Sequence, residues 1–406
     1  MNDNVKSSHA FIVLTAGVLF KLTIGILYVW TILKGSMQDV WGWEATQANL
    51  PYTLCIVMFA IFTLIGGRIQ DKMGPRWIAT CGGFFVGLGL FLSGYFGNNP
   101  TAITVCFGVL TGMGIGLGYS AATPAALKWF HASKKGLISG LVIGGFGLGP
   151  LMYAPITRFL LNNYGIEQTF MILGVSVLII SIIASQFIRN PITGYVPAEP
   201  MNIKQSVAKA PVNDITWTEM LKTKRFYYMI ILFFFMASPG LLIIGGLSNI
   251  IKSQAPSMYT NIAFLVMFLA AMNFSGRLLG GVLSDKIGRI NVIFTIIILQ
   301  AINFSLFRFY ASPIPMIIGI ILTGVGFGAT LSVFPALTAD QFGLKNYGVN
   351  YGIVYLFWGF SALLMPIVGS SIYDNVGNYY TAFLVSALLM GAMFVVNVML
   401  KRDIKS

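Results

Sequence analysis

The sequence predicts an all-α integral membrane protein whose twelve transmembrane helices form two pseudo-symmetric six-helix bundles. Three observations lead to this fold class. Hydrophobic residues make up 56% of the 406 residues and charged residues only 9%, whereas soluble domains seldom exceed about half apolar residues. Apolar runs of roughly 18 or more residues, each long enough to cross a bilayer, recur along the chain. The third observation is an internal repeat, which relates the two halves.

Each half of the chain contains six candidate spans. The first six are Phe11–Leu33, Gln47–Gly67, Trp77–Phe96, Ala102–Leu127, Gly136–Leu160 and Thr169–Ile188. The second six are Phe226–Ile250, Asn261–Val282, Ile290–Tyr310, Pro313–Thr338, Gly348–Tyr373 and Tyr379–Leu400. The polar, proline-containing stretch Arg189–Arg225 separates the two sets. We therefore expect an N-terminal bundle at residues 1–188, a cytoplasmic linker at 189–225 and a C-terminal bundle at 226–406.

The loop charges predict the orientation. Most loop Lys and Arg residues fall on one side of the expected membrane, and the other side has few, namely Lys34, Arg158, Lys252 and Arg308. Because positive loops stay inside, both termini should be cytoplasmic and the protein should lie in the inner (plasma) membrane as a multi-pass protein. The net charge of +13 is then explained by topology, so we expect the lipid bilayer, and no nucleic acid, as a partner. The first ten residues lack the features of a cleavable signal peptide.

The internal repeat places equivalent motifs in the two halves. It pairs GRIQDKMG (Gly67–Gly74) with GVLSDKIG (Gly281–Gly288), and Gly136 and Gly140 with Gly348 and Gly352. Both octapeptides follow the second span of their half. A duplicated half of this kind is typical of a transporter whose site lies at the interface between the repeats.

Two charged residues, Lys21 and Arg277, lie well inside the expected spans, whereas Asp and Glu do not. A charge near the bilayer centre costs at least about 2.5–3.5 kcal/mol and usually faces a cavity. Arg277 shares a helical stripe with Asn273, and its planar, permanently charged fork suits a carboxylate. Two plainer interpretations remain. Arg277 could extend to the cytoplasmic edge, and the Lys21 amine could bond backbone carbonyls at a glycine-rich helix contact.

The repeated octapeptides resemble the loop motif of the major facilitator superfamily. The first copy is carried by Gly67, Asp71, Lys72, Gly74 and Arg76, and the second by Gly281, Asp285, Lys286, Gly288 and Arg289. The resemblance implies that these loops clasp neighbouring helix ends and control closure on the cytoplasmic side. Asp71, Arg76, Asp285 and Arg289 are thus gating candidates, since a carboxylate is favoured at a helix N-terminus. The alternative is a tight turn with topogenic charge.

Further motifs resemble the monocarboxylate transporters and the related oxalate/formate antiporters over almost the full length. They are GILYVWT (Gly25–Thr31), TPAALKWFHASKKGLISG (Thr123–Gly140), NFSGR (Asn273–Arg277), VFPALTADQFG (Val333–Gly343) and NYGIVYLFWG (Asn350–Gly359). The resemblance implies that Arg277 binds the substrate carboxylate. Two departures stand out: Asn273 replaces the aspartate of animal monocarboxylate carriers, and Trp358 replaces the second cation, a lysine, of oxalate/formate antiporters. Lys21 matches neither pattern.

Aromatic residues are expected to shape the rest of the site. Tyr28, Tyr119, Phe334, Tyr355 and Trp358 lie in spans that line the cavity in this family. A small pocket with aromatic walls and a few polar groups suits a small organic acid. Taken singly, each could equally be an ordinary aromatic residue of a membrane span.

The leading functional prediction is a carrier of small monocarboxylates, such as lactate or pyruvate, that transports a proton with the anion and acts as a monomer. Proton coupling is assigned to Lys21, working beside Arg277, because arginine keeps its proton whereas a desolvated lysine can release one. The alternatives are an anion antiporter of the oxalate/formate kind and, with less support from the sequence, a sensor. We expect no enzyme activity, catalytic residue, metal site or cofactor.

Overall fold

The computed structural model describes residues 3–192, 194–197 and 214–405. Within these ranges the regular structure is entirely helical, in agreement with the predicted fold class. Much of the linker expected at 189–225 lies outside the described residues. The helices of the first half are α1 (Asp3–Ile24), η1 (Gly25–Val29), α2 (Trp30–Trp41), α3 (Ala45–Met73), α4 (Pro75–Tyr95), α5 (Pro100–Ile103), η2 (Thr104–Thr111), α6 (Gly112–Leu127), η3 (Ala132–Lys134), α7 (Lys135–Gly147) and α8 (Gly149–Ser185).

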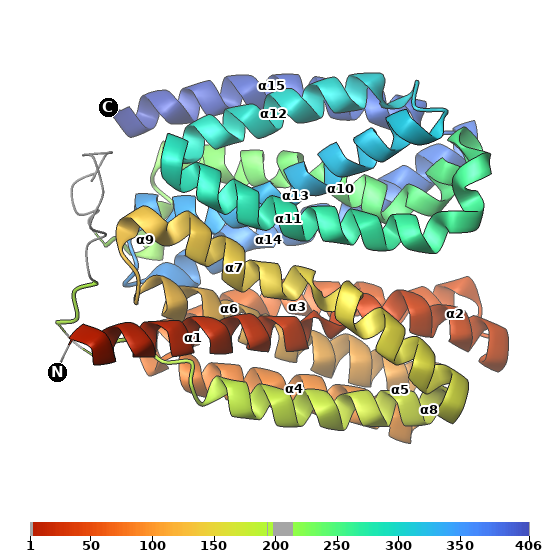
Figure 1. The fold of residues 1–406 in the computed structure, drawn as a ribbon, viewed down its shortest axis with the longest axis horizontal. Helices are drawn as coiled ribbons and strands as arrows, with labels where there is room; N and C mark the ends of the chain where they lie inside the picture. Colours follow the sequence, from red (N-terminus) through yellow and green to blue (C-terminus); the bar gives the residue numbers. More distant parts are fainter. Residues whose placement is uncertain (1–2, 193, 198–213, 406) are drawn as a thin grey trace.

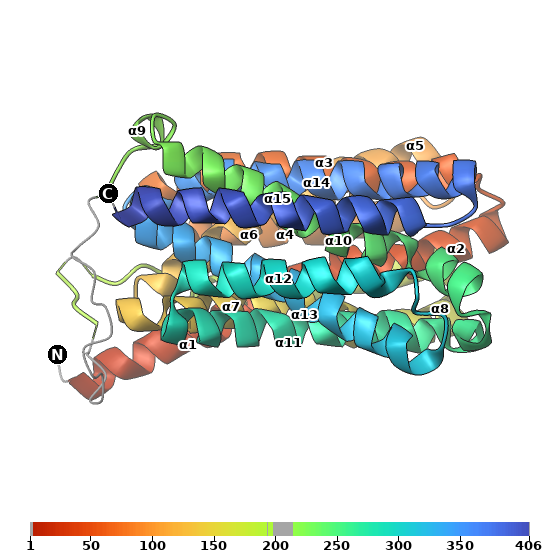
Figure 2. The ribbon, with the colours of Figure 1, turned by 90° about the horizontal axis from the view of Figure 1, so that it is seen from above.

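The second half is built in the same way from long helices. They are α9 (Trp217–Met220), α10 (Lys224–Gln254), η4 (Pro256–Asn261), α11 (Ile262–Ile287), α12 (Arg289–Phe307), α13 (Pro313–Phe342), α14 (Tyr347–Val376) and α15 (Tyr380–Lys405). Figure 1 shows α1–α8 in the lower half of the view and α10–α15 in the upper half. The view turned by 90° shows the long helices running roughly along one common axis (Figure 2).

The predicted twelve membrane passes are present in the described chain. Eleven of its helical segments are long and apolar enough to cross a membrane, and the longest of these, Ala132–Ser185, has 54 residues. At 1.5 Å per residue this segment would far exceed one bilayer core. Gly165 interrupts it with φ 78°, and the chain turns back there (Figure 1). The segment therefore contains two passes, as the sequence predicted.

The first span differs from the continuous helix expected at Phe11–Leu33. The chain narrows into the 3₁₀ helix η1 at Gly25–Val29 and continues as α2 to Trp41. A Cβ atom at Gly25 would lie 2.7 Å from the Phe146 carbonyl oxygen and 3.2 Å from the Gly149 Cα. The close approach of the end of α7 and the start of α8 therefore requires glycine here. A 3₁₀ stretch inside a helix often marks a hinge.

Helix α1 begins and α15 ends at the same end of the bundle, which we call the terminal face (Figure 1). The two halves meet along two equivalent helix pairs, α3 with α14 and α11 with α7. At the first pair, a Cβ atom on Gly67 would overlap the Gly348 carbonyl. At the second, one on Gly281 would overlap the Gly136 carbonyl. The repeated glycines thus allow the backbones of the two halves to touch, as small residues do in membrane proteins.

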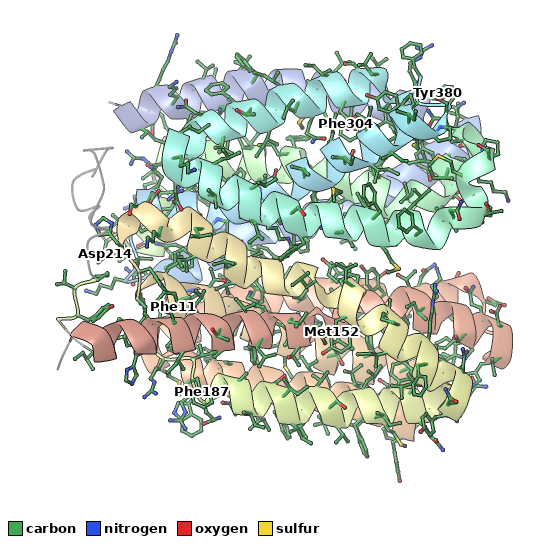
Figure 3. All side chains as sticks on the ribbon, in the orientation of Figure 1. Phe11, Met152, Phe187, Asp214, Phe304 and Tyr380 are labelled. Carbon is green, nitrogen blue, oxygen red and sulfur yellow. The ribbon has the colours of Figure 1, made fainter. Side chains whose placement is uncertain are left out.

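The outer faces of both halves carry large apolar side chains (Figure 3). Phe11 is 59% exposed, Ile179 53% and Leu388 67%. In a protein with these long apolar helices, such faces are suited to contact with lipid.

We expect Gly281→Ala to destabilise the protein by about 1–3 kcal/mol, because the added methyl group overlaps the Gly136 carbonyl. Gly391→Ala is the matched control, since a Cβ atom there meets nothing within 4 Å. It should be neutral or stabilising by up to about 1 kcal/mol, because alanine favours helix over glycine. Thermal unfolding of the two purified variants in detergent tests this. Equal shifts in the two variants would contradict the proposed close contact.

Candidate functional site

Lys21 lies at the centre of the first half with none of its surface exposed. Its Nζ donates a hydrogen bond to the Tyr119 carbonyl oxygen at 2.8 Å and lies 2.9 Å from the centroid of the Tyr119 ring. A Cβ atom on Gly145 would approach the Lys21 Cβ to 3.2 Å, so α7 closes over the lysine. An ammonium group has three donors, and this carbonyl is the only hydrogen-bond acceptor it reaches among the described residues.

Arg277 is 1% exposed and joins the two halves. Its Nε donates to Asn273 Oδ1 at 3.1 Å, so the predicted pair on one stripe of α11 is in contact. Its Nη1 donates to the Ile143 carbonyl oxygen of α7 at 2.5 Å. The guanidinium is therefore buried between α7 and α11 and does not extend to the terminal face, as the plainer interpretation would require.

The last turn of α7 separates the two cations. Gly145 faces Lys21, whereas a Cβ atom on Gly147 would lie 2.9 Å from the Arg277 Cζ. Between them, the Phe146 ring packs edge-on to Tyr119 at 5.5 Å. The position of this glycine-rich run beside Lys21 and Arg277 was not predicted from the sequence. The sequence did contain a signal for this position, because glycines at 144, 145 and 147 flank the single aromatic residue Phe146.

The positive charge of this region has no protein counter-ion in the described part of the chain. The ion pairs found there join Lys135 and Arg289 to Asp340, Arg225 to Asp403, and Arg289 to Asp285. Neither Lys21 nor Arg277 takes part in them. Because an uncompensated buried charge is costly, this arrangement favours an anion bound near the two cations.

The five aromatic residues predicted for the site belong to one network of ring contacts. Tyr119 and Tyr355 have ring centroids 4.9 Å apart, and Tyr355 and Trp358 4.7 Å apart. Tyr28 and Phe334 join this network through rings that sequence reasoning did not single out. Residues from α3, α6, α7, α10, α13 and α14 thus form an aromatic wall across both halves.

Three phenylalanines were missed as parts of this wall. Phe146 meets Tyr28 at 5.4 Å and Phe233 stacks on Phe334 at 4.4 Å. Phe59 lies 5.1 to 5.9 Å from the rings of Tyr119, Phe146, Tyr355 and Trp358. Each lies in a uniformly apolar run, where the sequence alone does not distinguish an inward-facing ring from a lipid-facing one.

Several buried polar atoms near the wall have no hydrogen-bond partner among the described residues. They include Trp358 Nε1 and Thr123 Oγ1. An unsatisfied buried polar group costs about 1–3 kcal/mol. Such atoms offer directional contacts to a small polar ligand.

The two predicted gating carboxylates cap helices of the opposite half. Asp71 accepts hydrogen bonds from the backbone N–H groups of Gly348 and Val349, both at 2.9 Å. Asp285 accepts from Gly136 and Leu137 at 2.8 and 2.7 Å. Both aspartates therefore hold the terminal face together at helix N-termini, where the helix dipole favours an anion.

The arginines of the two motif copies differ in their partners. Arg289 Nη1 bonds Asp285 at 2.5 Å and its Nε bonds Asp340 at 3.0 Å. Arg76 instead bonds the side chain of Gln186 in its own half. Lys135, from α7, also reaches Asp340 at 3.0 Å. The ion pairs of Asp340 with Lys135 and Arg289 thus belong to the same network as Asp285. No role for Lys135 or Asp340 was predicted from the sequence.

The charge of Lys128 interacts with that of Asp71 near the terminal face. Burial lowers the pKa of the Lys128 amine, which follows α6, while the carboxylates of Asp71 and Asp214 oppose this shift. Asp214 itself accepts hydrogen bonds from the backbone N–H groups of Leu344 and Lys345 at 2.8 and 3.0 Å. The chain that enters the second half is thereby fixed to the α13–α14 loop.

Comparison with known proteins agrees with this geometry. The sequence model of the Major Facilitator Superfamily matches residues 11–302 and 243–405. An uncharacterized MFS-type transporter of Escherichia coli (strain K12) is 28% identical over 354 residues, which are 87% of this chain and 86% of that protein. The oxalate:formate antiporter of Oxalobacter formigenes is 28% identical over 381 residues, covering 93% and 88% of the two chains.

A monocarboxylate transporter of Danio rerio, 12-B, is 24% identical over 369 residues, which are 83% of this chain and 76% of that protein. Among solved structures, the E. coli fucose:proton symporter FucP aligns with a TM-score of 0.74 and 14% sequence identity. The alignment covers 96% of this chain and 98% of that one. At this identity the structural match supports the fold alone.

Proposed function

The chain belongs to the major facilitator superfamily and is a membrane transporter rather than an enzyme, and from this premise we propose that it carries small monocarboxylates with a proton. Lactate and pyruvate are examples of the expected substrate. The observation that carries the proposal is the pair of buried basic side chains, Lys21 and Arg277, without a carboxylate partner among the described residues. A small organic anion would supply the missing charge, and the aromatic wall would limit its size.

We further propose that transport occurs by alternating access. Residues 1–188 and 226–406 would move as two bundles around the site, joined by the linker 189–225. The described arrangement is closed at the terminal face by Asp71 and Asp285. We assign this face to the cytoplasm because positive loop residues gather there, which makes both termini cytoplasmic in an inner-membrane protein. One chain contains both bundles and would act as a monomer.

A second candidate function is exchange of organic anions of the oxalate/formate kind. It is favoured by the presence of two buried cations, because a dianion could pair with both. The relative from Oxalobacter formigenes is named for such an exchange. Uptake by proteoliposomes, with a panel of mono- and dicarboxylates and separately imposed pH and anion gradients, distinguishes the two functions. Accumulation driven by a pH gradient supports symport, whereas a strict need for internal anion supports exchange.

Arg277→Ala should abolish saturable uptake, because it removes the substrate's counter-charge. Arg277→Lys keeps the charge but loses the fork, so binding should weaken by about 1.5–3 kcal/mol, or roughly 10- to 100-fold. Uptake and substrate binding of both purified variants are measured. Arg308→Ala, at the opposite end of the bundle, is the control for the loss of an arginine. Normal saturable uptake by folded Arg277→Ala would exclude the assigned role.

Lys21→Gln should uncouple transport from the proton gradient. In our mechanism the empty site holds charged Arg277 and neutral Lys21, and an arriving monoanion makes protonation of Lys21 easier. The variant should therefore still exchange labelled for unlabelled monocarboxylate, yet no longer accumulate it when the vesicle interior is alkaline. Lys34→Gln, whose lysine bonds Asn49, serves as the matched control. Continued accumulation by Lys21→Gln would show that the proton travels by another route.

Asp285→Asn should weaken closure of the terminal face. The two carboxylate oxygens each accept one backbone hydrogen bond, and asparagine replaces one of these oxygens by an NH₂ group, which cannot accept. We expect slower turnover and more frequent opening of that face, with ligand affinity nearly unchanged. A cysteine introduced at buried Ser139, which contacts Ser332 across the halves, should react faster with a maleimide in this background. Asp374→Asn, an exposed change near the opposite end, should have no effect. If Asp285→Asn changed which substrates are transported, a gating role would be contradicted. The variant Asp71→Asn is tested with the same measurements.

A further inference from the structure

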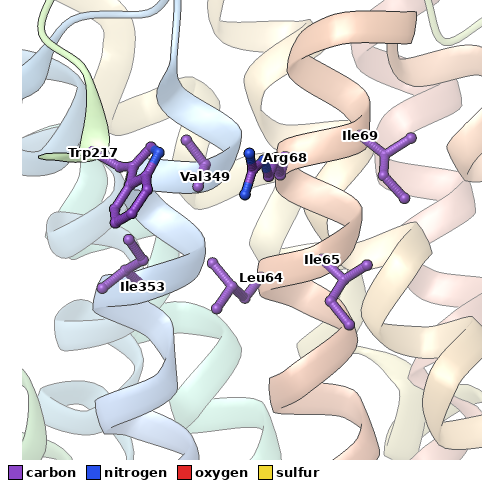
Figure 4. Close-up of a pocket in the computed structure, with 7 residues that line it drawn as sticks. All are labelled: Leu64, Ile65, Arg68, Ile69, Trp217, Val349 and Ile353. Carbon is purple, nitrogen blue, oxygen red and sulfur yellow. The ribbon is translucent and has the colours of Figure 1, made fainter.

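A groove of about 460 Å³ lies between the two halves near the terminal face and away from the buried cations. Figure 4 shows that its walls come from α3 and α14, with the Trp217 indole of α9 beside α14. The volume falls in the range of ligand pockets, roughly 300–1,000 Å³. Its lining residues are Leu64, Ile65, Arg68, Ile69, Trp217, Val349 and Ile353.

Arg68 is the one charged residue in this apolar lining. It is exposed and has no hydrogen bond or ion pair with any described residue. The nearby carboxylate of Asp71 is already occupied by the N–H groups of α14 and by the Gln70 side chain. Arg68 therefore presents an unpaired cation at the edge of an apolar groove.

The charge of Arg68 is not part of the repeated motif. The equivalent position of the second copy, directly after Gly281, is Val282. Asp285 in that copy caps its helix just as Asp71 does, without an arginine at this position. Closure of the terminal face therefore does not need Arg68, which leaves the residue available for a separate role.

We propose that this groove binds an anionic phospholipid, with an acyl chain against Leu64, Ile65 and Ile353 and the phosphate on Arg68. Arg68 lies five residues before the end of α3, about 7.5 Å along the helix axis. That depth is within reach of a headgroup for a long side chain. Trp217 is 37% exposed, as expected for an indole at the membrane interface. Basic pockets between membrane helices on the cytoplasmic side suit anionic headgroups.

The bound lipid would stabilise the closed arrangement. The groove takes one wall from each half of the protein, so it exists in this form only while α3 and α14 are together. Val349 connects the two features, because its side chain lines the groove and its N–H donates to Asp71. Opening the terminal face would separate the walls and release the lipid.

Quenching of Trp217 fluorescence by brominated lipids tests the proposal in proteoliposomes of the full chain. The fluorescence of Trp217 is obtained by subtracting the emission of the Trp217→Phe protein from that of the protein with Trp217. This subtraction is made separately for the wild type and for each variant. Brominated phosphatidylglycerol should quench Trp217 more strongly than brominated phosphatidylcholine at equal mole fraction. Arg68→Gln should reduce this preference about fivefold, as expected for the loss of one basic side chain at an anionic surface.

Two further variants control the charge and the location. Arg68→Lys keeps the charge and should retain most of the preference. Arg308→Gln removes an arginine from a groove at the opposite end, where Arg308 lies over the rings of Phe309 and Tyr380, and it should leave the quenching of Trp217 unchanged. Equal quenching by the two lipids in the wild type, or an undiminished preference in Arg68→Gln, would overturn the proposal. Neither result would bear on the substrate site.

Discussion

Burying two basic side chains without a carboxylate partner is the constraint on which the rest of this structure depends. Desolvating a charged group is expensive, and Lys21 and Arg277 are almost completely covered. The protein offsets part of this cost with backbone carbonyls, that of Tyr119 for the lysine and that of Ile143 for the arginine. The Ile143 carbonyl belongs to α7, where the glycines at 145 and 147 let the helix approach Lys21 and Arg277 closely. The glycine-rich sequence of α7 is thus a consequence of the charges as well as of helix packing.

Helix α7 also connects the charges to the terminal face. Its first residues donate hydrogen bonds to Asp285, and Ile143, near its other end, accepts one from Arg277. Both partners lie on α11, so the same two helices are joined at the gate and at the site. A carboxylate that binds Arg277 would compete with the Ile143 carbonyl and loosen the joint at its inner end. Substrate binding and gating would then be coupled through one helix pair, over a length of about 10–12 Å.

Much of this arrangement could be predicted from the sequence, because it depends on local patterns. Hydrophobic runs predict the passes, and four-residue spacing places Asn273 beside Arg277, where a hydrogen bond of 3.1 Å joins them. The break at Gly25–Val29 could not be predicted, since it depends on Gly149, far along the chain. The same is true of Phe59 and Phe233, whose inward orientation is decided by tertiary packing. The different partners of Arg76 and Arg289 also depend on which residues other helices bring near.

The two copies of the internal repeat have diverged at the positions that precede their shared glycine. Four and eight residues before Gly281 stand Arg277 and Asn273, and at the same places before Gly67 stand Thr63 and Phe59. Both pairs are linked within their own helix, since the Thr63 hydroxyl donates to the Phe59 carbonyl at 2.8 Å, as Arg277 donates to Asn273. The first half uses these positions to place Phe59 in the aromatic wall, and the second half uses them for its cation. A strictly symmetric pair would have given two facing arginines or two facing aromatic residues. The divergence of the copies instead places an aromatic ring at this position in the first half and a guanidinium near the equivalent position in the second, so that the two halves contribute different groups to the region between them.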